Sequence, residues 1–264
     1  MAAGASSPQV VAHRGASHDN AEHTLGAYVA ALEAGADGLE CDVRLTADGH
    51  LVCVHDRTLR RTASTPGLVS TSDLADLNEL DFASWKNPWA DLNDEAPERD
   101  ESLDRVLTLR KLLETTADYD RRVEVAIETK HPTRFGGLVE KRLVEMLRDF
   151  GWDRPGSPVR VMSFSFTALQ RVERMAPDVR IVQLVDRPQY WPMLRRIIGD
   201  DWIVGPGIDL LRENPRLGTR ITRAGHDLHV WTVNTVSDLR LCQELGVKAV
   251  ITDRPAYVLE TLGR

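Results

Sequence analysis

The sequence has little cysteine. Its three cysteines, Cys41, Cys53 and Cys242, are scattered and show no CxxC spacing. This pattern indicates neither a disulfide framework nor a zinc site. Cys41 and Cys53 fall within strand-like runs, where we expect them to be small buried apolar residues.

Long apolar runs and an excess of basic charge are also missing. No stretch approaches the roughly 20 apolar residues that span a membrane, and the opening MAAGASSPQVV lacks the basic and apolar parts of a signal peptide. The formal net charge of −7 argues against nucleic acid or an anionic membrane as a partner. We therefore expect a cytoplasmic protein without stable membrane association, whose oligomeric state the sequence does not define.

What the sequence does contain is a repeated alternation of short apolar runs with amphipathic segments. The runs predict strands at 9–13, 38–45, 123–130, 159–164, 179–185, 202–208, 228–233 and 249–252. The segments between them predict helices at 24–34, 103–116, 138–150, 167–175, 190–198, 215–224, 236–245 and 256–262. Eight strand–helix units in 264 residues predict a single domain, 1–264, folded as a (β/α)₈ TIM barrel, with an open doubly wound sheet as the alternative.

One insertion interrupts this alternation after the second strand. A tight turn at 46–50 leads into another alternating run, 50–56, which predicts a hairpin. Residues 57–102 follow, with a short helix that we expect Ser72 to cap and then a stretch rich in Trp and acidic residues. Loops of this length are usually functional, and our hypothesis is that residues 82–100 form a lid or select the substrate.

Titratable side chains collect where the predicted strands end. In this fold the carboxyl ends of the strands build the active site. Residues two apart in a strand project to one face, which pairs Glu40 with Asp42 and Glu128 with Lys130. The strand exits carry His13, Arg14, His55, Asp56, Glu128, Lys130, Trp231 and Asn234.

Glu40, Asp42 and Glu128 would together give three hard oxygen ligands, which Mg²⁺ or Ca²⁺ prefers. Each residue alone also has a structural interpretation, because strand carboxylates often pair with basic neighbours and aromatic residues often fill barrel mouths. The convergence of so many such residues at strand exits favours a site. The other six histidines are interpreted as structural or solvated, with His23 and His131 as the best candidates for a further role.

This set of residues fits hydrolysis of a phosphodiester. Arg14, Lys130 and a divalent cation would hold phosphate oxygens. One of His13 and His55 would deprotonate the attacking oxygen, and the other would protonate the departing alcohol.

The residues also carry a resemblance: the chain resembles the glycerophosphodiester phosphodiesterase family over nearly its whole length. The resembling motifs are HRG at 13–15, AEHTL at 21–25, LECDVRLTADGHLVCVHD at 39–56, ETK at 128–130, SFS at 163–165, VWTVN at 230–234 and AVITDRP at 249–255. The resemblance implies release of an alcohol and glycerol 3-phosphate from small-molecule glycerophosphodiesters such as glycerophosphocholine.

The resemblance also implies roles for individual residues. It assigns His13 and His55 as the acid–base pair and Glu40, Asp42 and Glu128 as ligands of a divalent metal. Other residues that it implies are Arg14 and Lys130 as phosphate contacts, Glu22 as a site residue near the metal or Arg14, and Trp231 as a wall against the glycerol end.

The chain departs from the family pattern at two places. His23 stands where the family usually has Asn, and Glu101-Ser102-Leu103 stands where it has Pro-Thr-Leu. Neither change removes a predicted ligand or catalytic histidine. Two other functions remain open: a phospholipase D-like enzyme that forms a cyclic phosphate from a lysophospholipid, and a binding protein that holds a phosphodiester without turnover.

Overall fold

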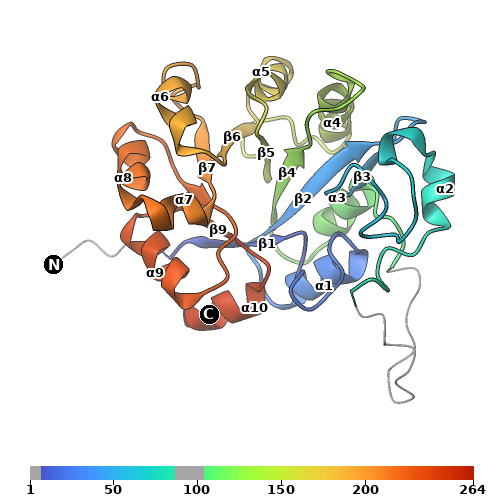
Figure 1. Cartoon of the computed structure of the whole chain (residues 1–264), viewed down its shortest axis with the longest axis horizontal. Coiled ribbons are helices and arrows are strands. Elements are labelled where there is room, and N and C mark those ends of the chain that lie inside the picture. Colours follow the sequence, from blue (N-terminus) through green and yellow to red (C-terminus); the bar gives the residue numbers. More distant parts are fainter. Residues whose placement is uncertain (1–6, 87–103) are drawn as a thin grey trace.

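The computed structural model describes residues 7–86 and 104–264, and this part of the chain forms a barrel (Figure 1). The parallel strands are hydrogen-bonded in the order β7-β6-β5-β4-β2-β1-β9-β8, and the bridges Val204–Leu228 and Gly207–Trp231 join β7 to β8. Within the described residues, eight parallel strands therefore form a nearly closed barrel, which confirms the predicted (β/α)₈ fold. The strands are β1 (Gln9–His13), β2 (Gly38–Leu45), β4 (Glu124–Thr129), β5 (Val159–Ser163), β6 (Arg180–Val185), β7 (Ile203–Pro206), β8 (His229–Val230) and β9 (Ala249–Thr252).

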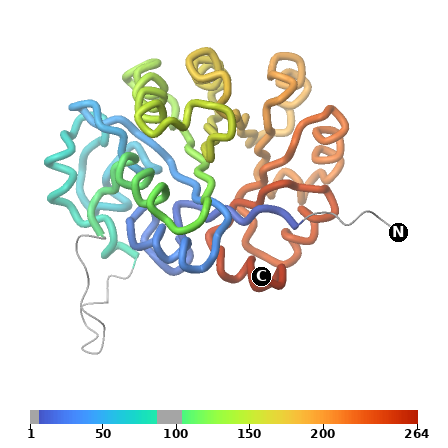
Figure 2. Tube along the Cα trace, turned by 180° about the vertical axis from the view of Figure 1, so that it is seen from behind, coloured from blue at the N-terminus to red at the C-terminus, as the bar shows by residue number. Residues whose placement is uncertain are grey.

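Helices surround the strands in the cartoon and in the Cα trace seen from behind (Figures 1 and 2). Their buried residues recur at helical spacing, as in α4, where Leu143, Val144 and Leu147 are buried against the sheet side. The helices are α1 (Leu25–Glu33), α2 (Leu74–Asn78), α3 (Leu109–Ala117), α4 (Leu138–Asp149), α5 (Phe166–Met175), α6 (Trp191–Leu194), α7 (Ile208–Glu213), α8 (Pro215–Arg223), α9 (Val236–Glu244) and α10 (Pro255–Thr261).

Two apolar cores divide the side chains of most of the parallel strands. One core lies between strands and helices and contains Val10 and Ala12 of β1, whereas the other fills the barrel and contains Val11. Because side chains alternate along a strand, His13 belongs to the same inward row as Val11. The alternation thus explains why polar residues near strand ends reach the barrel mouth.

Several predicted boundaries are wrong. The predicted strand 202–208 ends at Pro206, and Ile208 begins α7 after Gly207. The predicted strand 228–233 is reduced to β8, and the predicted helix 190–198 to α6 with one 3₁₀ turn before it. The predicted helix 103–116 starts six residues later in the chain at Leu109, since Thr108 caps α3 and Leu107 accepts a hydrogen bond from Cys53 of β3 (Leu51–Cys53).

The hairpin after β2 is confirmed: β3 (Leu51–Cys53) pairs antiparallel with β2. The start of the insertion packs a small core of its own onto this hairpin, in which Val69 and Leu77 are buried. The expected Ser72 cap is wrong, because Asp73 is the N-cap of α2 and the Ser72 hydroxyl instead donates to the Leu68 carbonyl. Most of the proposed lid, residues 87–100, and the Glu101-Ser102-Leu103 motif lie outside the described residues.

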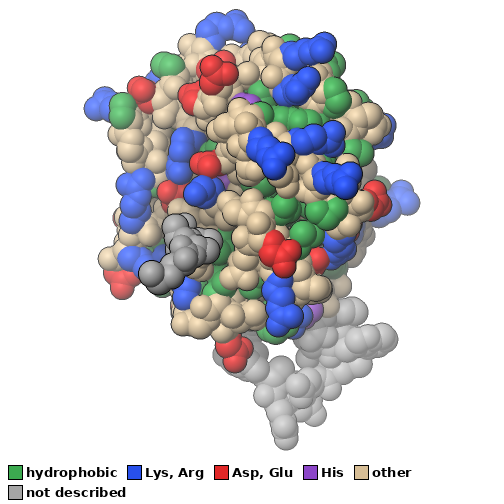
Figure 3. Space-filling view, turned by 90° about the vertical axis from the view of Figure 1, so that its left-hand side faces the viewer, with side chains coloured by type: hydrophobic (Ala, Val, Ile, Leu, Met, Phe, Trp, Pro, Cys, Tyr) green, Lys and Arg blue, Asp and Glu red, His purple; other side chains and the backbone are tan. Residues whose placement is uncertain are grey.

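The face shown in Figure 3 carries charged side chains of both signs with apolar side chains between them. In the part of the chain that the structure describes, no helix combines the length and the apolar character that crossing a membrane requires. Cys41, Cys53 and Cys242 are buried and free, and the burial of Cys41 and Cys53 confirms the prediction made for these two residues.

Candidate active site

His13 and Arg14 stand where β1 ends, and strand pairing fixes what lies beside them. The parallel register of β1 and β2 places His13 next to Glu40. The chain then turns sharply, with φ of 57° at Arg14 and 85° at Gly15. A Cβ at Gly15 would lie 2.6 Å from the carbonyl carbon of Ala27 in α1, so only glycine lets the turn pack this closely.

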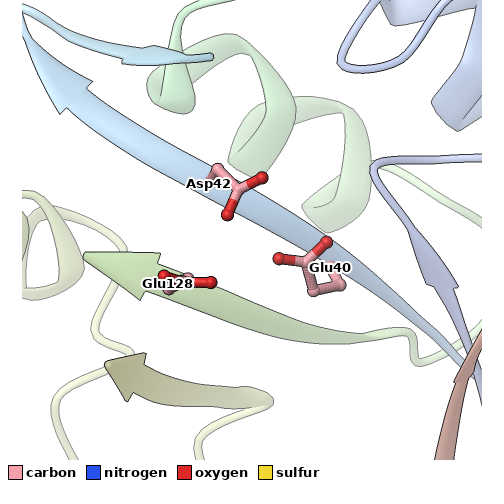
Figure 4. A group of neighbouring side chains, drawn as sticks. All are labelled: Glu40, Asp42 and Glu128. Carbon is pink, nitrogen blue, oxygen red and sulfur yellow. The ribbon is translucent and has the colours of Figure 1, made fainter. Parts of the chain in front are cut away.

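Three buried carboxylates share a small space at the barrel mouth. Glu40 and Asp42 come from β2, and Glu128 of β4 is the register partner of Asp42. One oxygen from each carboxylate lies within 4.8 Å of the others, and Figure 4 shows the three groups on the same side of the two strands. Burial together with the charge of Asp42 raises the pKa of Glu128 to about 8 and the pKa of Glu40 well above its usual value.

This acidic cluster fits a divalent metal ion. Crowded buried carboxylates repel one another unless a cation or a proton lies between them, and the raised pKa values of Glu40 and Glu128 reflect burial first and that repulsion second. Three carboxylates supply the hard oxygen donors that Mg²⁺ and Ca²⁺ prefer.

Arg14 and Lys130 lie beside the acidic cluster. Lys130 Nζ is 2.8 Å from Glu128 Oε1 and 3.2 Å from Asp42 Oδ1, and Arg14 Nε is 3.0 Å from Asp42 Oδ2. The Arg14 contact is an ion pair without hydrogen-bond alignment. Although burial acts to raise the pKa of Asp42, a hydrogen bond to His23 and the charges of Lys130 and Arg14 hold that pKa well below its usual value.

His13 is held by a carboxylate from the other end of the chain. Its Nδ1 lies 2.6 Å from Asp253 Oδ1, just after β9. Asp253 also accepts hydrogen bonds from Ser17 Oγ at 3.0 Å and from Asn234 Nδ2 at 2.6 Å. Against the effect of burial, these contacts lower the pKa of Asp253 to about 2, so the group is an ionised carboxylate at neutral pH. Within residues 7–86 and 104–264 the Nε2 of His13 has no protein partner, and His13 lines the site cavity.

His55 has a corresponding carboxylate. Its Nδ1 lies 2.7 Å from Asp56 Oδ1, and Arg61 Nε donates to the other oxygen of Asp56 at 2.8 Å. The two terminal nitrogens of Arg61 each donate to Glu22 at 2.7 Å. The hydrogen bond from Arg61 lowers the pKa of Asp56 to about 2. Arg61 therefore joins the loop after β1 to the segment after β3.

Burial and nearby cations act on His55 and Glu22 in different ways. Burial, with the positive charges of Arg14 and Lys130, lowers the pKa of His55 and favours its neutral form. Burial opposes ionisation of Glu22, but hydrogen bonds and charge from Arg61 and Arg14 lower its pKa to about 2. Arg14 Nη1 donates to Glu22 Oε1 at 3.1 Å, so Glu22 lies beside Arg14, one of the two positions that the resemblance implies.

His23 connects helix α1 to the acidic cluster. It is buried, with Nδ1 2.8 Å from the Tyr28 hydroxyl and Nε2 2.9 Å from Asp42 Oδ2. The Tyr28 hydroxyl in turn donates to the Glu40 carbonyl at 3.0 Å. The φ of His23 is 62°, a left-handed conformation that Asn and His adopt more readily than most other residues. The exchange of Asn for His thus keeps a residue suited to this backbone position.

The cavity of the candidate site encloses about 250 Å³ and has two sides. Its apolar side includes Trp231, whose Nε1 donates to the Gly205 carbonyl at 2.8 Å and whose ring meets Phe164 edge-on with the ring centroids 5.6 Å apart. Met162, Leu184 and Ile251 complete that side. Its polar side consists of His13, Arg14, Glu40, His55, Glu128, Lys130 and Asp186. A ligand with a charged part and a less polar part matches these two sides.

The structure brings all the predicted site residues to the same barrel mouth, and their roles remain predictions. His23 approaches the site, whereas His131 does not, because its Nε2 bonds to Glu140 of α4 at 2.5 Å. Sequence reasoning gave no role to Asp253 and Arg61. Asp253 could have been found from the sequence, since it directly follows a predicted strand. Arg61 lies in the insertion, where no sequence pattern pointed to the site.

Comparisons with known proteins agree with this geometry. The model of the glycerophosphoryl diester phosphodiesterase family matches residues 13–257. A Mycobacterium tuberculosis protein named probable glycerophosphodiester phosphodiesterase 1 is 44% identical over 252 residues, covering 94% of this chain and 90% of the relative. A Bacillus subtilis glycerophosphodiester phosphodiesterase is 32% identical, covering 93% of this chain and 83% of the relative.

A solved structure shares the whole architecture. The Oleispira antarctica phosphodiesterase, in complex with the product sn-glycerol-3-phosphate, has a TM-score of 0.82 and 25% identity, covering 97% of each chain. The fold and the site define an enzyme that acts on phosphoric diesters on a (β/α)₈ barrel. The chain belongs to the glycerophosphoryl diester phosphodiesterase family.

Proposed function

We propose that the protein hydrolyses small-molecule glycerophosphodiesters to glycerol 3-phosphate and a free alcohol, with Mg²⁺ or Ca²⁺ held by Glu40, Asp42 and Glu128. The observation that carries this proposal is one cavity in which His13 and His55, each with Nδ1 on a carboxylate, lie with an acidic cluster that fits a metal ion. A bound divalent cation supplies positive charge that offsets the charge of the phosphate oxygens.

His55 is the proposed general base. Its lowered pKa keeps it neutral near pH 7, and its Nδ1 contact with Asp56 leaves Nε2 to accept a proton. In the proposed step a water oxygen forms a bond to phosphorus and gives its proton to His55. A substrate hydroxyl in place of water would give a cyclic phosphate.

His13 is the proposed general acid. The ionised Asp253 beside Nδ1 holds the ring so that Nε2 is left to give a proton, as a carboxylate orients the ring in other histidine-dependent hydrolases. When the bond between phosphorus and the departing oxygen breaks, His13 gives its proton to that oxygen and the alcohol leaves neutral. The two histidines then return to their starting forms by exchanging protons with solvent.

Arg14 and Lys130 are the proposed contacts of the phosphate, because each places a cationic group in the cavity beside the acidic cluster. Trp231 and its apolar neighbours would pack against the carbon chain of the glycerol end. Glycerol 3-phosphate is the product bound in the Oleispira antarctica structure, and this supports a glycerol phosphate as the product here.

The test is a panel of glycerophosphodiesters with different alcohols, incubated with the protein and each metal and followed by phosphorus NMR. We expect glycerol 3-phosphate to appear with at least one substrate. A cyclic phosphate as the end product would assign the nucleophile to a substrate hydroxyl. Binding of every substrate without any product, with metal confirmed bound, would overturn the proposal in favour of a binding protein.

A further inference from the structure

A second cavity adjoins the candidate active site and shares Lys130 with it. It encloses about 260 Å³ between β2, the segment after β3 and the loop that leads to α4. The charged residues among its described lining are all cationic: Arg44, Arg57, Lys130 and Arg134. We name this cavity the arginine recess.

The three arginines of the recess have no carboxylate partner within the described part of the chain. Arg44 directs Nε and Nη2 to the His55 carbonyl at 2.9 and 2.6 Å, and Arg134 directs Nη1 to the Ser70 carbonyl at 3.4 Å. Arg57 is exposed and takes part in no ion pair among residues 7–86 and 104–264. These side chains differ from Arg61, Arg212 and Arg264, each of which pairs with a carboxylate.

Like charges lining one concave surface favour an anion as the ligand. Arg44, Arg57, Lys130 and Arg134 line the recess, and no carboxylate is among its described lining residues. A planar guanidinium can donate two parallel hydrogen bonds to a phosphate, and several such groups facing one cavity can hold a phosphate with high specificity.

The recess is placed to receive a part of the same ligand that enters the active site. Arg44 follows Asp42 by two residues on β2, so it continues the inward row that carries the acidic cluster. Lys130 lines both cavities. Arg44 also holds the carbonyl of His55, so a ligand in the recess would lie next to the backbone of the proposed general base.

We propose that the arginine recess binds a phosphate group, and that its source is a glycerophosphodiester whose alcohol carries a second phosphate. The choice of source rests on the proposed function, whereas the binding of phosphate does not. Free inorganic phosphate presents the same oxygen atoms to the recess and is the alternative source. The second arm of the test distinguishes binding of inorganic phosphate from binding of the substrate.

The first arm compares glycerophosphoglycerol with glycerophosphoglycerol phosphate, which differ only by a phosphate on the alcohol. We expect kcat/KM of the unmodified protein to favour the phosphorylated substrate by about tenfold or more, the scale of one charge-assisted contact. Arg57→Gln and Arg134→Gln should each remove most of this preference. Arg60→Gln is the matched control, because Arg60 is exposed on the same segment and lines neither cavity, and it should keep the preference.

The second arm titrates inorganic phosphate into metal-free protein by calorimetry. If phosphate binding is weakened by about tenfold in Arg57→Gln and Arg134→Gln but not in Arg60→Gln, the recess binds phosphate whether or not a substrate is turned over. If phosphate binding is weakened in this way but neither substrate is hydrolysed, the proposed function is rejected and the recess remains a phosphate site. The proposal would be overturned if folded Arg57→Gln and Arg134→Gln kept both the substrate preference and the phosphate affinity of the unmodified protein. The recess would then be a solvated basic surface.

Discussion

Asp253 Oδ1 lies 2.6 Å from His13 Nδ1, although 240 residues separate the two along the chain. Strand pairing creates the contact, since β1 and β9 are neighbours in the barrel and both end at its mouth. Ser17 and Asn234 hold the carboxylate from two sides. Asp253 is thus a positioning residue for a proposed catalytic histidine.

Asp253→Asn should therefore reduce activity without unfolding the protein. The amide keeps the size of the side chain but loses the charge that stabilises an imidazolium, so we expect kcat to fall by about 10- to 100-fold with a smaller change in KM. The pH–rate profile should differ from that of the unmodified protein, because the negative charge beside the His13 ring is lost. Ser17→Ala, which leaves the carboxylate in place, is the control and should retain activity within about threefold. A pH profile identical to that of the unmodified protein would contradict this role.

His13→Ala and His55→Ala should each abolish most turnover while metal binding persists. Removing a general acid or base costs about 10²- to 10⁴-fold in rate, and neither ring belongs to the acidic cluster. Calorimetric titration with Ca²⁺ and rate measurements on the same preparations check both parts. His18→Ala removes an exposed histidine of the same loop and should leave the rate unchanged. Full activity in either of the first two variants would exclude that residue as acid or base.

Glu40→Gln and Glu128→Gln should weaken metal binding. Each change removes one charged oxygen donor from the acidic cluster, and we expect the metal dissociation constant to rise by about tenfold or more. Excess metal should restore part of the activity. Glu33→Gln, on the exposed face of α1, serves as the control. Unaltered Mg²⁺ and Ca²⁺ affinity in both site variants would show that the cluster holds neither ion.

The contact between His23 and Asp42 can be tested by replacing His23 with either of two amides of different length, Asn and Gln. Asn can place a nitrogen near the position of Nδ1, facing Tyr28, whereas Gln can reach the position of Nε2, facing Asp42. We expect His23→Asn to lose the Asp42 contact, destabilise the fold by about 1–3 kcal/mol and weaken metal binding. His23→Gln should lose less metal affinity. Equal metal affinity in the two variants would contradict a link through Asp42.

The carboxylates around Arg61 should make stability depend on acid pH. In the folded protein the pKa of Glu22 and of Asp56 is about 2, below the usual values of 4.5 and 3.8, so the folded state binds fewer protons than the unfolded state. Their contribution to stability is full above about pH 5 and is lost as the pH falls toward 2. Arg61→Gln should lower the unfolding free energy by about 1 kcal/mol at pH 7, a small value because Arg61 is partly exposed.

Urea unfolding of both proteins between pH 7 and pH 2 measures this difference. The gap between unmodified protein and Arg61→Gln should narrow as the carboxylates take up protons. A gap that stays constant down to the lowest pH would show that the ion pairs of Arg61 do not contribute to stability.

The barrel and most of its site could be predicted from sequence because both follow from strand periodicity. Alternation along β2 places Glu40 and Asp42 on one face, and the carboxyl ends of parallel strands meet at one end of the barrel. The boundaries of strands and helices were harder to predict. Ile208 continues an apolar run, so its place at the start of α7 is set by the turn at Gly207 rather than by periodicity.

Contacts between distant segments account for what the sequence could not supply. The pair His13–Asp253 depends on barrel closure, and the link from Arg61 to Glu22 depends on how the insertion packs. Arg44 shares the inward row of Asp42, but only the folded chain shows that Arg57 and Arg134 line the same cavity.

The most direct test of the account is release of glycerol 3-phosphate from glycerophosphodiesters, including glycerophosphocholine, by the purified protein after chelation and after metal is returned. We expect no product from the chelated protein, and restored release with Mg²⁺ or Ca²⁺ from the unmodified protein but not from His13→Ala. Release that continues at the same rate in chelator, or no release from any substrate with metal confirmed bound, would contradict the account.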